Sequence, residues 1–280
     1  MLEIIKATED QVSFKATEFS LRQIASSGQC FRWYPFASNE FIIIHQGKIL
    51  DIEEYYPDTF ILHCSEIEFN EIWKNYFDFE TDYHKFLDAV YESEDEFLLS
   101  SISCGMGIRI LNQDPWESLI TFIISQQNNI PRITGIIHRL CQACGEPVGT
   151  AYGDTYYSFP SAEQILDKYK SLKSVGVGFR EKYIIEACKR VNAGYDLERL
   201  RHCSAEEAVK ELKTFYGVGD KVANCVSLFG LGHKEAFPRD VWINRIIDKY
   251  YGGEFDTSRF EGFSGVIQQY MFHYERMIRE

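Results

Sequence analysis

The sequence predicts an α+β protein in which an N-terminal antiparallel β-sheet subdomain precedes a mainly α-helical core. Short β-rich runs separated by turn residues occupy the first hundred residues, and apolar residues at helical spacing dominate from about Asp114 onward. With 280 residues, 45% of them hydrophobic, the chain can bury a full core, which excludes a disordered protein and a disulfide-stapled miniprotein. We expect a sheet subdomain with a flanking helix at residues 1–103 and a helical core at residues 104–280.

The early part of the chain contains four candidate strands. They are Phe31–Tyr34, Phe41–His45, Lys48–Ile52 and Thr59–His63. The pair Gln46-Gly47 lies between the second and third runs, which predicts a hairpin, because a glycine supplies the positive φ that a tight turn needs. A helix is expected near Ile67–Leu87.

Helix-start signals mark the later part of the chain. Asp114 and Pro115 are suited to be the N-cap and the first helical residue of an apolar stripe, and a second stripe follows Pro131. Ser204 and Glu207 have the spacing of a capping box. We expect the chain after Asp114 to be almost entirely helical.

Charge is distributed unevenly along the chain. The net charge is −13, but residues 1–103 contain 7 Lys and Arg against 20 Asp and Glu, whereas residues 104–280 contain 22 of each. Within Ile165–Arg190 there are seven basic and three acidic residues. The acidic total therefore does not exclude a nucleic-acid partner, because this basic segment can face a polyanion.

The eight cysteines do not predict a metal site. Cys141 and Cys144 form one Cys-x-x-Cys pair, with no second pair at zinc-finger spacing and no four-cysteine run for an iron–sulfur cluster. We expect reduced thiols in packing roles and no cofactor. Because the sequence lacks a run of about 18 apolar residues and a secretion signal, it predicts an intracellular protein with no membrane partner, cytoplasmic if the host is prokaryotic.

The segment Leu212–Phe229 predicts two helices joined by a Gly-x-Gly turn, within a helix-hairpin-helix unit at residues 204–229. Gly217 and Gly219 let the backbone bend sharply, so that its N–H groups and the start of the second helix can bind a phosphate. A Gly-x-Gly turn is also compatible with a plain helix-to-helix connection.

Two ionisable residues near this turn are candidates for chemistry. Lys221 lies in the first turn of the second helix, where the helix dipole favours the neutral, nucleophilic amine. A solvated surface lysine is the ordinary alternative. Asp240 is suited to be the N-cap of the next helix, and as an N-cap it needs no catalytic role.

Five ordered segments together resemble one family. Gly217–Lys221 followed by Pro238–Val241 resembles the helix-hairpin-helix DNA glycosylases that carry a catalytic lysine and aspartate. Gly28–Trp33 (GQCFRW), Asp114–Cys141 and Gly176–Ile184 make the chain similar to the 8-oxoguanine DNA glycosylase/AP lyases. The resemblance extends from about residue 20 to 275.

This resemblance implies a DNA repair enzyme that flips 8-oxoguanine out of double-stranded DNA, where it lies opposite cytosine, and excises it. Lys221 would attack C1′ of the sugar to give a covalent imine, from which the strand is cut by β-elimination. Asp240 would stabilise positive charge on the sugar and orient the lysine. A monomer is expected by the same analogy.

The resemblance also implies residues that bind the flipped base. The backbone carbonyl of Gly28 would accept a hydrogen bond from N7–H, which the oxidised base has and guanine lacks. Gln268 and Phe272, spaced i and i+4 on one helix, would bind the base edge and stack on the ring. Cys225, one turn after Lys221, would lie on the other side of the base.

Residues facing the opposite strand show departures from the family. Gln127, Arg132 and Arg180 match positions that hold the orphaned cytosine, and Phe179 matches the aromatic residue that wedges into the stack. Gln127 stands where an asparagine is usual, and Phe179 where a tyrosine is usual. Trp242 replaces a frequent histidine, which puts a phosphate contact at that position in doubt.

Two other hypotheses remain open. One is an alkylated-base DNA glycosylase of the same fold, which would activate water with Asp240 and use no lysine. The other is a non-catalytic DNA-binding protein in which the glycine turn only binds phosphate. Lys221 argues against the first, and the second leaves both the segment Gly28–Trp33 and the Lys221–Asp240 pair unexplained.

Overall fold

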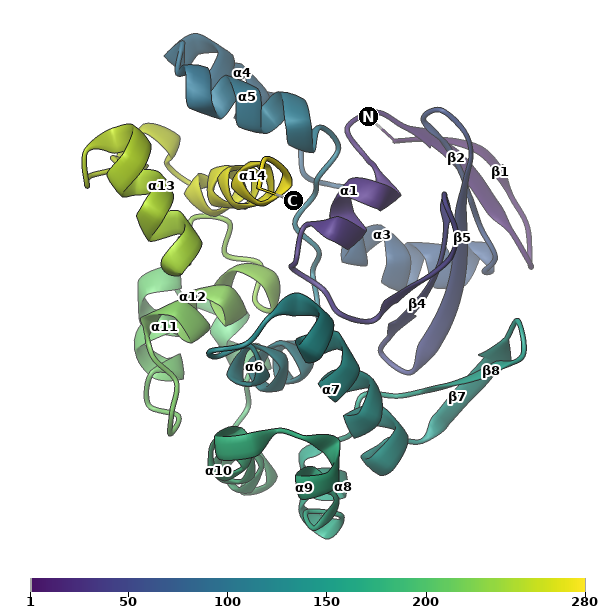
Figure 1. Cartoon of the computed structure of the whole chain (residues 1–280). Coiled ribbons are helices and arrows are strands. Elements are labelled where there is room, and N and C mark those ends of the chain that lie inside the picture. Colours follow the sequence, from purple (N-terminus) through teal and green to yellow (C-terminus); the bar gives the residue numbers. More distant parts are fainter. Residues whose placement is uncertain (1, 280) are drawn as a thin grey trace.

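The structure, a computed structural model, describes residues 2–279 and begins with the predicted antiparallel sheet. Its strands are β1 (Leu2–Ala7), β2 (Val12–Ala16), β3 (Trp33–Ala37), β4 (Glu40–His45), β5 (Lys48–Tyr56) and β6 (Thr59–Leu62). They are ordered β1-β2-β6-β5-β4-β3, with every neighbouring pair antiparallel (Figure 1). The predicted hairpin is confirmed, because Gln46 and Gly47 both have positive φ between β4 and β5. Strands β1 and β2 were not predicted.

Helix α1 (Leu21–Ser26) and a second helical segment contribute to the core of the sheet subdomain. The second segment is α2 (Glu66–Glu68), π-helix η1 (Phe69–Trp73) and α3 (Lys74–Tyr76). The prediction of one helix near Ile67–Leu87 is wrong, because the chain turns at Asp78, which has φ 56°. Arg109 stabilises this turn by donating hydrogen bonds to the backbone carbonyls of Phe77, Asp78 and Thr81.

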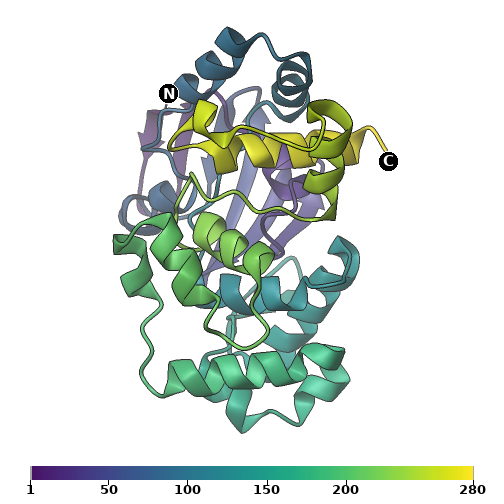
Figure 2. The same cartoon turned by 90° about the vertical axis from the view of Figure 1, so that its left-hand side faces the viewer.

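The second part of the chain is a helical core. Its helices are α4 (His84–Ser93), α5 (Glu96–Gly105), α6 (Pro115–Ile124), α7 (Ile130–Cys144), α8 (Ala162–Asp167), α9 (Ser171–Val175), η2 (Gly178–Arg180), α10 (Glu181–Asn192), η3 (Glu198–His202), α11 (Ala205–Leu212), α12 (Asp220–Phe229), α13 (Val241–Tyr251), η4 (Thr257–Phe260) and α14 (Ser264–Met277). Figure 2 shows α11 and α12 between the α13–α14 pair above and α10 below, with the sheet behind.

Helix α4 and most of α5 precede residue 104 but contribute to the helical core, where α5 packs against α14. The predicted division at residue 103 stays a prediction. The predicted helix starts are confirmed. Asp114 is the N-cap of α6, where its carboxylate accepts a hydrogen bond from the Glu117 N–H, and Pro115 is the first helical residue. Ser204 and Glu207 form a capping box at the start of α11.

The expectation of an almost entirely helical second part is wrong at one hairpin, β7 (Pro147–Ala151) with β8 (Asp154–Tyr157). Its turn, Tyr152-Gly153, has two positive φ angles but lacks the usual Asn or Asp signal. The hairpin packs on the first sheet: the Tyr152 ring stacks on Phe36, and its hydroxyl contacts Glu40 and Asp51 at 2.6 and 2.7 Å.

All eight cysteines are free thiols, and six of them are buried. Within residues 2–279 there is no cluster of three or more His, Cys, Asp and Glu side chains that could hold a metal ion. No helix of this part of the chain is long and apolar enough to span a bilayer.

Candidate active site

The α11–α12 hairpin brings its backbone close to neighbouring elements. Gly217 has φ +82°, and a side chain there would overlap the ring of Tyr183 from α10. Val218 is buried, whereas the space beside Gly219, the N-cap of α12, is open. The first N–H groups of α12 therefore start at an uncrowded surface, a suitable geometry for an anion.

Lys221 follows this turn and is half-buried rather than solvated. Its Nζ donates a hydrogen bond to Ser125 Oγ at 2.9 Å and lies 5.1 Å from the centre of the Phe122 ring. Both partners come from α6 and the residue that caps it. The surface-lysine alternative is not what the structure shows, since the amine is held against another helix.

Cys225 and Asp240 belong to the same group of residues as Lys221. Burial raises the pKa of the Cys225 thiol to about 11, opposed by the charge and hydrogen bond of Lys221, while the Asp240 carboxylate raises it further. Asp240 is the predicted N-cap of α13, where its Oδ1 accepts from the N–H groups of Trp242 and Ile243 at 2.9 and 2.8 Å. Within residues 2–279, no ion pair within 4.0 Å joins Lys221 to Asp240.

The predicted base-binding residues form a second group. Gly28 has φ +80°, and a β-carbon there would lie 3.2 Å from Phe272 Cε1 and 3.1 Å from Ile130 Cδ1. Gln268, one turn before Phe272 on α14, is 4% exposed, and its Oε1 makes no hydrogen bond within the described residues. A buried amide oxygen without a partner is a suitable acceptor for a ligand N–H.

A network that the sequence analysis missed holds the Gly28 segment. The Gln29 side chain donates to Ser27 Oγ and to the Arg109 carbonyl, both at 2.9 Å, and accepts from the Leu111 N–H at 2.8 Å. Gln113 donates to the Gln29 carbonyl at 2.8 Å. Apart from the bond to Ser27, no local pattern predicts these contacts, because the partners are 80 to 84 positions apart in the sequence.

A third group contains the predicted opposite-strand residues. Phe179 is 48% exposed in η2, just before α10, as a wedge residue would be. The Arg180 side chain next to it is only 2% exposed, and its guanidinium lies 4.5 Å from the Phe179 ring. Gln127 and Arg132 are exposed. Burial lowers the pKa of Arg180, and the positive charge of Arg132 lowers it further.

Residues 125–129, which connect α6 to α7, and Ile130, the first residue of α7, contact all three groups. Ser125 accepts the Lys221 hydrogen bond, and Ile130 lies beside Gly28. Arg180 donates to the carbonyls of Gln126 and Gln127. One short connection therefore joins the candidate lysine, the candidate base pocket and the candidate wedge.

Trp242 lies at the start of α13 and is flanked by cations. The guanidinium carbons of Arg245 and Arg279 lie 5.9 and 5.4 Å from its ring centre. Arg279 also pairs with the buried Glu275. One face of α14 and its C-terminal end carries residues at i, i+4, i+7 and i+11 spacing: Gln268, Phe272, Glu275 and Arg279. Arg279 therefore lies on the same face as the base-binding residues.

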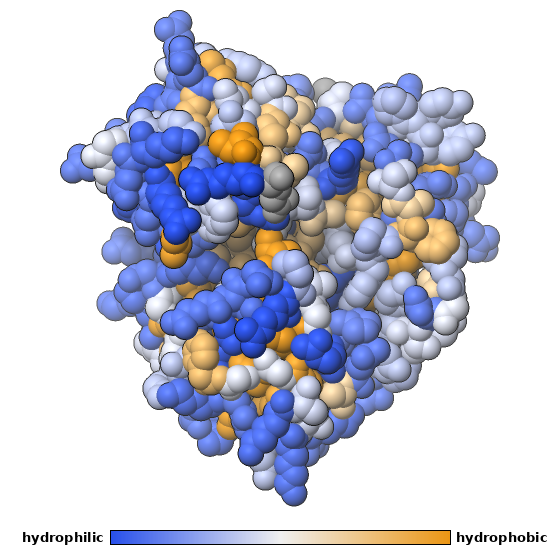
Figure 3. Space-filling model, in the orientation of Figure 1, coloured by the Kyte–Doolittle hydropathy of each residue, from blue (hydrophilic) through white to orange (hydrophobic). Residues whose placement is uncertain are grey.

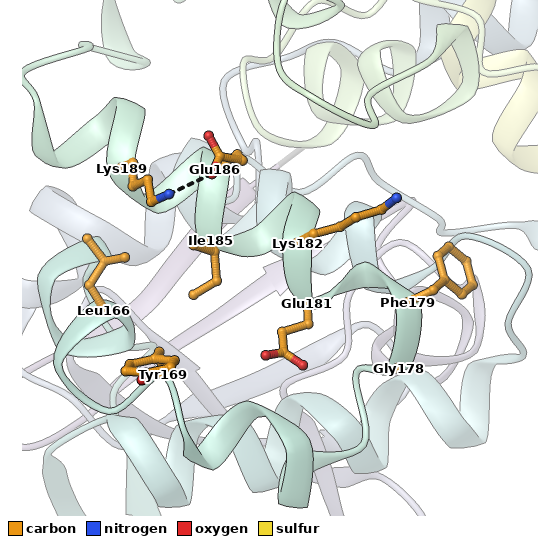
Figure 4. Close-up of a pocket in the computed structure, with 9 residues that line it drawn as sticks. All are labelled: Leu166, Tyr169, Gly178, Phe179, Glu181, Lys182, Ile185, Glu186 and Lys189. Carbon is orange, nitrogen blue, oxygen red and sulfur yellow. Dashed lines mark hydrogen bonds and ion pairs between the residues drawn. The ribbon is translucent and has the colours of Figure 1, made fainter.

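An open groove of about 650 Å³ lies beside Phe179 and contains neither Lys221 nor Asp240. Figure 4 shows Lys182 and Phe179 on one side of it and Tyr169 on the other, with Lys189 paired to Glu186. Figure 3 shows a separate hollow between the α13–α14 part, the sheet and the α6–α7 part, with hydrophobic residues at its bottom and hydrophilic residues on its rim.

Comparison with known proteins gives consistent matches along the chain. Residues 11–119 match the 8-oxoguanine DNA glycosylase N-terminal domain, and residues 120–259 match the HhH-GPD superfamily of base excision DNA repair proteins. The N-glycosylase/DNA lyase of Saccharomyces cerevisiae is 30% identical over 270 residues, covering 86% of this chain and 70% of the relative.

A probable N-glycosylase/DNA lyase of Methanothermobacter thermautotrophicus is 30% identical over 230 residues, covering 71% of each chain. Among solved structures, the 8-oxoguanine glycosylase/lyase of Clostridium acetobutylicum, bound to double-stranded DNA with cytosine opposite 8-oxoguanine, superposes with a TM-score of 0.90. Its sequence is 32% identical, and the match covers 100% of this chain and 99% of the other.

Proposed function

The chain belongs to the HhH-GPD superfamily and, within it, to the 8-oxoguanine N-glycosylase/DNA lyases, and from this premise we propose that it excises 8-oxoguanine from duplex DNA and cuts the strand at the resulting site. The observation that carries the proposal is the position of Lys221. A half-buried primary amine lies at the start of a helix whose preceding turn is suited to bind a phosphate, in the same group as a carboxylate.

The proposed chemistry uses that amine twice. The lone pair of a neutral Lys221 forms a bond to C1′, while the bond from C1′ to the base breaks and its electrons leave with the base. The amine nitrogen, now bonded to C1′, loses one proton, and its lone pair forms the C=N bond as the C1′–O4′ bond breaks; the electrons of that bond go to O4′, which takes up a proton, and the product is a protonated imine. The imine withdraws electrons from C2′, so that a C2′ proton is lost and the 3′ phosphate leaves by β-elimination.

Asp240 has a double role in this proposal. One carboxylate oxygen caps α13, and the ionised group stabilises positive charge as it develops on the sugar. Because the carboxylate is held by two backbone N–H groups, it needs little reorganisation during the reaction.

Base recognition is assigned to the second group of residues. The Gly28 carbonyl would accept from N7–H of the oxidised base, the amide of Gln268 would bind the base edge, and Phe272 would stack on the ring. Cys225 would lie on the opposite face of the base. Guanine would present an N7 lone pair to the Gly28 carbonyl, which leaves a buried acceptor without a donor.

Recognition of the opposite strand is assigned to Gln127, Arg132, Phe179 and Arg180. Arg132 is exposed and cationic, so it can donate to the acceptors of cytosine. Phe179 would fill the space that the flipped nucleotide leaves. The partner is therefore duplex DNA that contains oxidised guanine opposite cytosine, bound by one copy of the chain with no cofactor.

DNA phosphates would be bound at the Gly217–Gly219 turn and beside Trp242. Arg245 and Arg279 provide positive charge there, where the family often has a histidine. The acidic residues of the sheet subdomain do not oppose this, because the charge of residues 104–280 balances to zero.

Borohydride trapping tests the proposed function. The protein is incubated with a duplex that contains one 8-oxoguanine opposite cytosine, borohydride is added, and covalent protein–DNA adducts are separated by denaturing electrophoresis. We expect a band with wild type and none with Lys221→Gln. An alkylated-base glycosylase that uses water, or a DNA-binding protein without activity, would give no band with wild type.

A further inference from the structure

The Ser125 hydroxyl makes two hydrogen bonds, and one of them is with Lys221. Its hydroxyl donates to the Phe122 carbonyl at 2.8 Å and accepts from Lys221 Nζ at 2.9 Å. Since a hydroxyl has only one hydrogen, the bond to Phe122 leaves only lone pairs facing the amine. Ser125 can therefore take up a hydrogen of Lys221 but cannot donate to the nitrogen lone pair, which stays available for bond formation.

The position of Ser125 depends in turn on its neighbours in the chain. Ser125 is the C-cap of α6, and its N–H donates to the Thr121 carbonyl at 2.9 Å. The next two carbonyls, of Gln126 and Gln127, accept hydrogen bonds from the buried guanidinium of Arg180.

Arg180 also donates to the carbonyl of Val177 at 3.2 Å, so the guanidinium makes four hydrogen bonds to backbone oxygens. An arginine that is 2% exposed and bonded to three backbone carbonyls holds the loop that carries those carbonyls. A continuous series of contacts therefore links Phe179 to Lys221. Arg180 contacts the Phe179 ring and the Gln126 carbonyl, and Ser125, next to Gln126 in the chain, contacts Lys221.

We propose that Ser125 is a positioning residue for the Lys221 amine and that Arg180 acts on the same amine by holding the connection that carries Ser125. The inference rests on the proposed function. It adds to the opposite-strand role proposed for Arg180 a second role, support of the nucleophile, which does not depend on the base in the opposite strand.

The first test is Ser125→Ala in full-length protein under single-turnover conditions, with the excision rate constant and DNA affinity measured separately. We expect the rate constant to fall about 10- to 100-fold with unchanged affinity and melting temperature, because a nitrogen that is not held in place attacks less often. Ser125→Thr, which keeps the hydroxyl, should recover most of the rate. Ser174→Ala is the matched control, because Ser174 also donates to the carbonyl three residues earlier but has no lysine partner.

The second test is a double-mutant cycle with Arg180→Lys, measured on duplexes with each of the four bases opposite the lesion. We expect Arg180→Lys to slow excision by a similar factor against all four bases, and to add little to the loss already present in Ser125→Ala. Full additivity of the two losses, or a loss confined to duplexes with cytosine, would overturn the proposal.

Failure of this inference can be distinguished from failure of the proposed function. If wild type gives no borohydride adduct, the proposed function fails. If wild type is trapped but Ser125→Ala excises at the wild-type rate, or Ser125→Thr is as slow as Ser125→Ala, only the role of Ser125 fails.

Discussion

Phe272 and Gly28 are in contact although 244 positions separate them: Phe272 Cε1 lies 3.2 Å from where a β-carbon on Gly28 would stand. Gly28 also has φ +80°, a conformation that other residues rarely adopt. Position 28 therefore needs glycine for two reasons, the backbone conformation and the space occupied by the aromatic ring. The proposed base-binding carbonyl and the proposed stacking ring are held together by this contact.

Gly28→Ala is expected to lower both the free energy of unfolding and the rate of excision. The positive φ costs on the order of 1–3 kcal/mol for a residue with a side chain, and the new methyl group would crowd Ile130 Cδ1 at 3.1 Å and Phe272 Cε1 at 3.2 Å. Denaturant unfolding and single-turnover excision measure the two effects. Gly194→Ala is the matched control, because Gly194 has φ +96° with open space around it. It should lose stability but keep activity, and equal activity of the two variants would contradict the assignment of Gly28.

Asp240→Asn is expected to keep DNA affinity and stability while slowing excision on the order of 10²-fold or more, because a preorganised charge is lost. Asparagine is as good an N-cap as aspartate, so the hydrogen bonds to the Trp242 and Ile243 N–H groups can persist. Asp240→Ala should lose about 1 kcal/mol of stability in addition. If Asp240→Asn loses affinity as much as rate, capping is the main role of the residue.

Local signals predicted the parts of this fold that depend on neighbouring residues. The Gln46-Gly47 hairpin, the Asp114 cap and the Ser204–Glu207 capping box each follow from contacts within a few positions. The break at Asp78 was not predicted, because that turn is stabilised by Arg109, 31 positions away. The β7–β8 hairpin was not predicted for the same reason, because Tyr152 is held by residues of the first sheet that are distant in the sequence.

The candidate site was predicted mainly through family resemblance, and the contacts between its residues came only with the structure. Nothing near Ser125 in the sequence indicates that its hydroxyl faces Lys221, 96 positions later. The burial of Arg180 was equally hidden, because an arginine near an exposed wedge gives no local sign that its guanidinium binds backbone carbonyls.

Glu117 is expected to make stability depend on pH. Burial raises the pKa of Glu117 from 4.5 to about 7, although Arg32, 2.9 Å away, lowers it and Asp114 raises it. A carboxyl with a raised pKa in the folded state takes up a proton on folding, so its contribution is present below about pH 4.5 and is lost as the pH rises through 7. Relative to Glu117→Gln, wild type should therefore lose stability between pH 5 and pH 8. Urea unfolding at both pH values measures this difference, and the opposite trend would show that attraction to Arg32 outweighs burial.

DNA affinity is expected to fall steeply with salt despite the acidic composition, because phosphate contacts release counterions. If Arg245 and Arg279 each contact a phosphate beside Trp242, Arg245→Gln and Arg279→Gln should each reduce the slope of log affinity against log salt by about 0.9. Lys6→Gln is the control, because Lys6 is exposed on β1, at the edge of the sheet opposite β3. Fluorescence anisotropy with a lesion duplex at several salt concentrations gives the slopes. Unchanged slopes in both arginine variants would place the phosphate contacts elsewhere, with the basic segment Ile165–Arg190 as the next candidate.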